Sequence, residues 1–152
     1  MKILIRNTKF SDINQIDNLN RKCLPENYTK DFWIQKFNES KPHSFVAIFS
    51  GQIVGYIFTD NNFIISLAVD EKFRSKGIAK ELTKHCLNTL KSIKLQVRIS
   101  NASAINLYNF FGFTIKKTIK SYYISPDEDG YVMKWINKDS SIKFVLNHKI
   151  NI

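Results

Sequence analysis

Apolar positions along the chain follow two different spacings. Seven short runs have the length and the β-branched or aromatic content of strands, and they cover residues 3–5, 44–49, 53–59, 63–69, 94–99, 114–123 and 130–136. Apolar residues three or four positions apart predict amphipathic helices that begin near residues 12, 29, 78 and 102. Strands and helices in this irregular order predict one α+β domain with a mixed, largely antiparallel sheet.

Local chemistry marks the ends of two of these helices. Ser11 or Asp12 can cap the first helix, and Leu24-Pro25 ends it because proline cannot continue a helix. Asn101 can cap the last helix, and Gly112 suits its C-terminal stop. We therefore expect a compact domain over residues 1–137. In the tail, 138–152, the apolar run 142–146 is a possible extra strand.

The segment around Gly77 combines a strand, a charged turn and a helix. A β-rich run ends at Val69, the charged stretch 70–76 follows, and helical spacing resumes at Ile78. A helix N-terminus presents unpaired N–H groups and a partial positive charge, so it binds phosphate well. Arg74, Lys76 and Lys80 add positive charge there. The alternative is that glycine simply starts the helix, and the turn alone does not decide between these interpretations.

Composition narrows the possible environments. The chain has no apolar stretch long enough to span a membrane and no signal-peptide pattern at its start. Two cysteines are too few for a disulfide framework, which favours a reducing, cytoplasmic location. The three histidines are scattered, so no metal site is expected. The net charge of +10 suits polyanions, the ribosome or a phosphorylated cofactor, or reflects compositional drift.

Two separated motifs resemble those of one enzyme superfamily. Arg74-x-x-Gly77-x-Ala79 and the Ser-Asn…Leu-Tyr…Gly-Phe pattern of 100–113, in this order of elements, resemble the GCN5-related N-acetyltransferases (GNAT) over residues 1–137. Four shorter strings, LPENY, SLAV, VRISN and SYY, resemble protein N-terminal (N-alpha) acetyltransferases. They are most like the catalytic subunit of the N-terminal acetyltransferase A complex (NatA type) and the RimI-like bacterial ribosomal-protein alanine acetyltransferase.

The resemblance implies that acetyl-CoA binds where two central strands splay apart near Val69 and Ile99. The pantetheine arm would lie along the end of the first strand, and the pyrophosphate would lie at the turn before the helix. The cofactor contacts implied in this way are Leu67, Ala68, Val69, Arg74, Ser75, Lys76, Gly77, Ile78, Ala79, Lys80, Asn101 and Tyr108.

Tyr108 is the candidate general acid, because a phenol beside the thioester sulfur can protonate the departing thiolate. The alternative is a core aromatic on the helix face. The bacterial alanine acetyltransferase has a glutamate at the position of Gln96, and a eukaryotic branch uses a tyrosine and a histidine at the positions of Phe63 and Gln96. Neither glutamine nor phenylalanine can accept a proton. Glu26 of LPENY is the remaining candidate for a group that places or deprotonates the amine.

The resemblance also implies an acceptor groove lined by Glu26, Tyr28, Tyr122 and Tyr123. An α-amine with a pKa near 8 is roughly 10% neutral at pH 7, whereas a lysine is below ~0.1% neutral. A weak base therefore favours a polypeptide N-terminus as the acceptor. The alternatives are a small-molecule amine or lysine, or a basic module that binds RNA or the ribosome. An auxiliary subunit or the ribosome is a possible partner; no RNA-binding motif indicates a specific nucleic acid.

Overall fold

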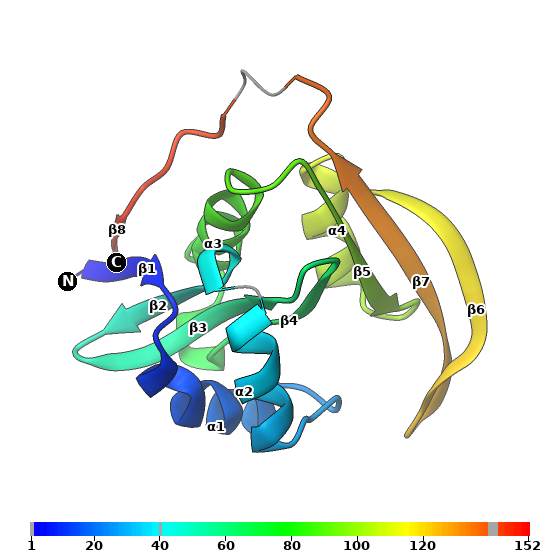
Figure 1. Ribbon diagram of the computed structural model, residues 1–152, viewed down its shortest axis with the longest axis horizontal. Coiled ribbons are helices and arrows are strands. Elements are labelled where there is room, and N and C mark those ends of the chain that lie inside the picture. The colour runs from blue at the N-terminus through cyan, green and yellow to red at the C-terminus, as the bar shows by residue number, and fades with distance from the viewer. Residues whose placement is uncertain (1, 40, 140–142) are drawn as a thin grey trace.

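The computed structural model describes residues 2–39, 41–139 and 143–152. Within these ranges one eight-stranded sheet runs in the order β6-β7-β5-β4-β3-β2-β1-β8 (Figure 1). Its strands are β1 (Lys2–Asn7), β2 (Phe45–Phe49), β3 (Gln52–Thr59), β4 (Phe63–Val69), β5 (Ser92–Arg98), β6 (Thr114–Ile124), β7 (Asp127–Ile136) and β8 (Lys149–Asn151). The prediction of an α+β domain with a mostly antiparallel sheet is confirmed.

The pairing of β4 with β5 is the exception in this sheet. It is parallel and is limited to Phe63 opposite Lys94 and Ile64 opposite Leu95. Beyond Ile64, β4 continues against β3, whereas β5 continues against β7. The two strands therefore diverge, and the sheet opens into two parts (Figure 1).

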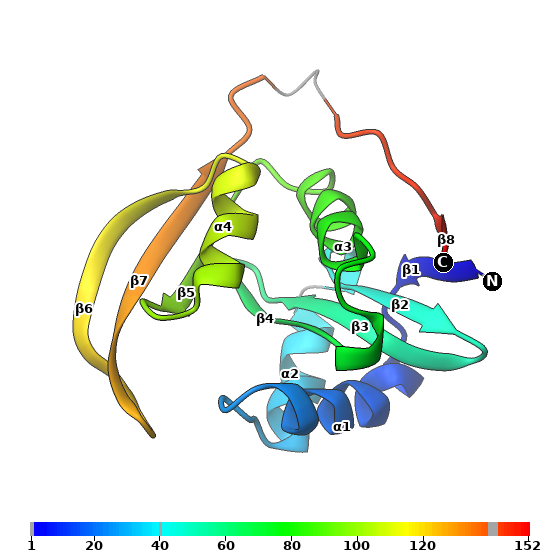
Figure 2. The same ribbon diagram turned by 180° about the vertical axis from the view of Figure 1, so that it is seen from behind.

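The helices cover both faces of the sheet (Figures 1 and 2). On one face, α1 (Ile13–Cys23) and α2 (Lys30–Glu39) bury residues such as Ile16 and Trp33 against β2, β3 and β4. On the other, α3 (Ile78–Leu87) and α4 (Ala102–Phe110) pack on a larger core that includes Leu82 and Tyr108. Three short 3-10 turns connect these elements, at Phe10–Asp12, Lys41–His43 and Glu71–Phe73. No helix among the described residues is long and apolar enough to cross a membrane.

Local capping chemistry is confirmed at α4 but not at α1. The Asn101 side chain accepts a bond from the Ala104 N–H (3.1 Å), and Gly112 takes a φ of +92° just after the helix. At α1, the Asp12 side chain makes no cap bond to its helix. Its carboxylate instead accepts bonds from both Arg6 Nη groups (2.7 and 3.0 Å) and from the Lys9 N–H (2.7 Å). Asp12 thus forms an ion pair with Arg6 of β1 in place of a helix cap.

The tail folds back across the sheet, and the predicted strand over 142–146 is misplaced. Residues 143–146 form no strand, Ile142 lies outside the described residues, and the strand is β8, which pairs with β1. Phe144 packs edge-on against Phe111 (5.5 Å between ring centroids) and lies beside Trp135. Its backbone N–H and carbonyl both bond to the Asn88 side chain, each at 2.8 Å. The tail is thereby fixed to the end of α3.

Asn88→Ala should loosen this attachment. The substitution removes two hydrogen bonds to Phe144 and should lower the free energy of unfolding by about 1–3 kcal/mol. Urea denaturation measures the change. Asn18→Ala is the matched control, because Asn18 is exposed on α1 and no side-chain hydrogen bond of it is found among the described residues; it should change stability by no more than about 0.5 kcal/mol. Equal stability of the two variants would contradict an anchoring role for Asn88.

Candidate active site

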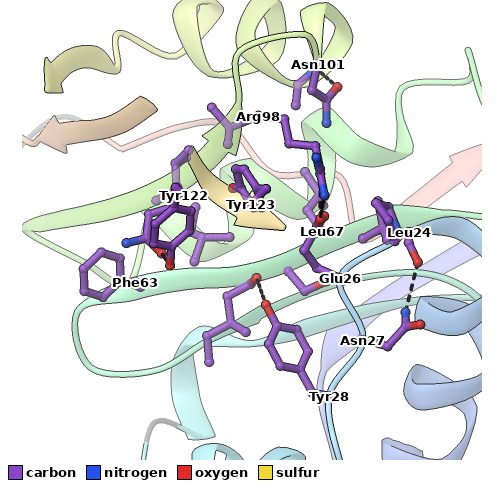
Figure 3. A pocket seen from close by; sticks show the side chains of 18 of the residues that line it. Leu24, Glu26, Asn27, Tyr28, Phe63, Leu67, Arg98, Asn101, Tyr122 and Tyr123 are labelled. Carbon is purple, nitrogen blue, oxygen red and sulfur yellow. Dashed lines mark hydrogen bonds and ion pairs between the residues drawn. The ribbon is translucent and has the colours of Figure 1, made fainter. Parts of the chain in front are cut away.

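The opening between β4 and β5 forms a cavity of about 840 Å³. Its walls come from the α1–α2 loop, the divergent parts of β4 and β5, the start of α4 and the tip of the β6–β7 hairpin (Figure 3). It brings together seven of the residues predicted for the site: Glu26, Tyr28, Leu67, Asn101, Tyr108, Tyr122 and Tyr123. Segments far apart in the sequence therefore meet at the break in the sheet.

Tyr108 lies on the α4 side of this cavity. The residue is only 5% exposed, its ring packs against Phe113 at 5.1 Å, and no hydrogen bond of its hydroxyl is found among the described residues. Burial raises the pKa of Tyr108, and the nearby Cys86 raises it further. The phenol therefore stays protonated at neutral pH, which is the state that a proton donor requires.

The turn before α3 presents free backbone amides. Ser75 and Gly77 have φ values of +62° and +83°, and no backbone hydrogen bond of the N–H groups from Ser75 to Lys80 is found in the part of the chain that the structure describes. A Cβ on Gly77 would meet nothing within 4 Å, so it is the backbone conformation that favours glycine there. These amides have the arrangement of an anion cradle.

The remaining predicted cofactor residues lie near this turn but do not line the cavity. Arg74 Nε donates a hydrogen bond to the Val69 carbonyl (2.9 Å). This bond satisfies the carbonyl of the last residue in β4. Lys80 Nζ lies 4.4 Å from the ring centroid of Phe110. The Ala68 side chain packs beneath α1 and α2, and Val69 and Ile78 are buried in the core on the other face, so their side chains serve packing.

The side of the cavity predicted to bind the acceptor is organised by an arginine that the sequence analysis did not single out. Arg98 Nε and Nη2 both contact Glu26 Oε1, at 2.9 and 2.7 Å (Figure 3). The guanidinium also lies over the ring of Tyr123, 4.4 Å from its centroid. Arg98 belongs to the string VRISN, but nothing local in that string indicates a partner 72 positions away.

The tyrosines around the mouth are held by specific contacts. Tyr28 stacks on Phe32 (4.6 Å), and its hydroxyl donates to the Ile65 carbonyl at 3.4 Å. Tyr122 donates to Gln96 Oε1 at 2.7 Å. Gln96 is thus engaged as a hydrogen-bond acceptor at a position where it cannot act as a base.

A buried polar cluster supports the α1–α2 loop from below, and sequence reasoning missed it. Asn20 Nδ2 lies 3.1 Å from the Glu26 carbonyl and 3.1 Å from the Tyr56 hydroxyl, which in turn lies 2.8 Å from Ser66 Oγ. Asn20 Oδ1 accepts from Asn27 at 3.0 Å. This network attaches the backbone at Glu26 to β3 and β4.

Comparison with known proteins identifies the family. The model of the acetyltransferase (GNAT) family matches residues 13–113. The chain belongs to this family. The match contains the divergent strands, the turn at Gly77 and α4, so the resemblance seen in the two motifs is confirmed.

Curated relatives and solved structures in the family agree with this assignment. The chain is 34% identical over 151 residues to an N-alpha-acetyltransferase of Sulfurisphaera tokodaii, covering 85% of this chain and 90% of the relative. It resembles the crystal structure of Ard1 from Thermoplasma volcanium with a TM-score of 0.83 and 28% identity, over 90% of this chain and 99% of the other. Arabidopsis thaliana Naa50, solved with the bisubstrate analogue CoA-Ac-MVNAL, gives a TM-score of 0.77 at 26% identity, over 88% and 97% of the chains.

The residues present fit the acetyl-CoA that the family uses. β4 has no strand partner on its β5 side beyond Ile64, so an extended pantetheine arm can lie beside it. The unpaired amides from Ser75 to Lys80 can receive the pyrophosphate. No group of three or more His, Cys, Asp or Glu side chains that could hold a metal ion occurs among the described residues.

Gly77→Glu should abolish acetyl-CoA binding, because it places a carboxylate in front of the amides that would hold the phosphates. Calorimetric titration with acetyl-CoA measures the loss. Gly51→Glu is the matched control, since Gly51 has a similar φ of +75° and similar open space in the β2–β3 turn. That variant pays the same conformational cost and should bind acetyl-CoA normally. Normal binding by a folded Gly77→Glu variant would refute the proposed pyrophosphate site.

Proposed function

We propose that this protein transfers the acetyl group of acetyl-CoA to the α-amino group of a polypeptide N-terminus. The observation that carries the proposal is the single cavity that joins Tyr108 and Asn101 to Glu26, Tyr28, Tyr122 and Tyr123. Relatives named N-alpha-acetyltransferase support the same acceptor, among them a Caenorhabditis elegans protein, daf-31, at 31% identity over 147 residues. The Naa50 structure with a peptide-containing bisubstrate analogue supports it further.

Bound acetyl-CoA supplies the activated acetyl group as a thioester. The amide groups from Ser75 to Lys80 would hold its phosphates, and Leu67, Val69 and Asn101 would orient it. Tyr108 holds a proton on its hydroxyl oxygen and would donate it to the thiolate sulfur that leaves when the amine nitrogen bonds to the acetyl carbon. Burial keeps that proton in place before the reaction, because it disfavours the phenolate.

The amine loses its proton without a strong protein base. Gln96 cannot accept one, and the Glu26 carboxylate is engaged by Arg98. Glu26 therefore serves to place the amine, and water takes the proton. An N-terminal amine tolerates this arrangement because roughly 10% of it is neutral at pH 7.

Two further features belong to the same proposal. The acetyltransferase works in the cytoplasm, which the two free cysteines, Cys23 and Cys86, support. An auxiliary subunit is a candidate partner, because a relative at 35% identity over 146 residues is named as an ARD1 subunit homolog of an N-terminal acetyltransferase complex in Dictyostelium discoideum. The basic charge of the chain supports the ribosome as an alternative partner.

Tyr108→Phe should bind acetyl-CoA with unchanged affinity but lower the rate of acetyl transfer by roughly 10²-fold, because the proton donor is removed. Single-turnover rates are the proper readout, since slow product release can hide a change in the chemical step. A normal single-turnover rate would leave Tyr108 with a packing role only.

A competition between two peptides tests the acceptor. One peptide has a free N-terminus and no lysine; the other has a capped N-terminus and one lysine. At pH 7 the first should be acetylated far faster, because its amine is neutral about a hundredfold more often. Its rate should rise with pH and level off above about pH 8, where the α-amine is mostly neutral. Preferential acetylation of the capped lysine peptide would refute the proposed function.

A further inference from the structure

Arg98 occupies the point at which the two halves of the acceptor mouth meet. The α1–α2 loop carries Glu26, and the tip of the β6–β7 hairpin carries Ser125, Pro126 and Glu128. We propose that Arg98 is a positioning residue that locks these two segments together and fixes one oxygen of Glu26, leaving the other oxygen to bind the incoming α-ammonium group. This inference rests on the proposed function.

The guanidinium of Arg98 makes four hydrogen bonds and one further ion-pair contact. Nε donates to Glu26 Oε1 (2.9 Å), Nη1 donates to the Pro126 carbonyl (2.8 Å) and Glu128 Oε1 (3.3 Å), and Nη2 donates to the Ser125 carbonyl (3.3 Å). The remaining Nη2 contact is Glu26 Oε1 at 2.7 Å. An arginine has five N–H donors in a rigid fork, so these four hydrogen bonds and one ion-pair contact employ most of its capacity. Its side chain is 11% exposed, so water does little to replace any of them.

Among the described residues, the hydrogen bonds that connect the two segments run through the Arg98 side chain. Within the described residues, no hydrogen bond joins the loop 24–29 directly to the hairpin tip 121–128. In the part of the chain that the structure describes, β6 pairs only with β7, and nearly all its side chains are exposed, so the tip has little packing to hold it. The shape of the acceptor mouth therefore depends on Arg98.

The same contacts reach the helix that carries Tyr108. Glu128 Oε2 accepts from the Ser100 N–H at 2.7 Å, and the next residue, Asn101, caps α4. One chain of hydrogen bonds, through Arg98 and Glu128, thus connects Glu26, which places the amine, to the start of α4, which carries the proton donor. A displaced hairpin would disturb both.

Glu26 keeps one oxygen available. Both contacts from Arg98 go to Oε1, and no hydrogen bond of Oε2 is found among the described residues. Its side chain is 34% exposed and lines the cavity. Because the group of Glu26, Glu128 and Arg98 carries two negative charges and one positive charge, it attracts an ammonium group.

Arg98→Met keeps a stem of similar length and removes every donor. It should raise the peptide KM about tenfold or more, because charged hydrogen bonds that shape the mouth are lost. The dissociation constant of acetyl-CoA, measured by calorimetry, should stay within about twofold. Arg98→Lys, which cannot make the forked contacts, should fall between the wild type and Arg98→Met. If Arg98→Met does not fold, Arg98→Lys carries the same test.

Arg6→Met is the matched control. It breaks a similar forked ion pair with Asp12, away from the cavity. It should lower stability but leave the peptide KM unchanged. A double-mutant cycle with Glu26→Gln adds a second criterion: if Arg98 acts through Glu26, the two effects on peptide KM should be strongly non-additive.

Hydrogen exchange gives a readout that does not depend on the acceptor. Arg98→Met should speed exchange in residues 24–29 and 121–128 and leave α3 unchanged. Failure of the wild type to acetylate any free N-terminus would refute the proposed function, and the exchange data would still test the Arg98 contacts. An unchanged peptide KM with unchanged exchange in a folded Arg98→Met variant, or equal losses for peptide and acetyl-CoA, would overturn the inference.

Discussion

A parallel pair of strands that separates after two residue pairs leaves backbone groups without partners, and every feature of this site follows from that separation. β4 and β5 are joined only at Phe63–Lys94 and Ile64–Leu95. Buried backbone groups without hydrogen bonds are costly, so the gap favours an extended ligand that can pair with β4. The same gap creates the cavity between Tyr108 and Glu26. Binding and catalysis thus both depend on an incomplete sheet.

An incomplete sheet needs support from outside the strands. On one face α3 and α4 share a core with both parts of the sheet, in which Leu82 and Tyr108 are buried. At the far end Phe144 of the tail packs between Phe111 and Trp135, and β8 then adds to β1. The tail therefore links the β5–β7 part to the β1–β4 part across the break. The acceptor side has no such apolar support, and polar contacts of Arg98 replace it.

The sequence predicts those parts of the site that depend on local chemistry. Gly77 and Asn101 both lie at helix starts. A positive φ favours glycine and a side-chain cap favours asparagine, so both positions can be recognised in the sequence. Arg98 and the Asn20–Tyr56–Ser66 cluster could not be found in this way, because the fold sets their partners: Arg98 meets Glu26 across 72 positions, and Asn20 meets Tyr56 across 36. Asp12 shows the opposite error, a predicted contact that does not form. Its carboxylate could cap α1, but it binds Arg6 instead. Local sequence patterns thus predict helix ends, whereas tertiary contacts determine the partners of charged side chains.

The pairing of Tyr122 with Gln96 shows how the chemistry can proceed without a strong base. A carboxylate at position 96 would face the same cavity as Glu26, and two carboxylates in one cavity repel each other and compete for protons. With glutamine there, the carboxylates beside Arg98 are Glu26 and Glu128, and the arginine offsets one of their two charges. The remaining negative charge suits attraction of a cation and not abstraction of its proton. The acceptor amine must then lose its proton without help from a strong base. The free-energy cost of this step is small only for an amine whose own pKa is near neutrality, as that of a polypeptide N-terminus is.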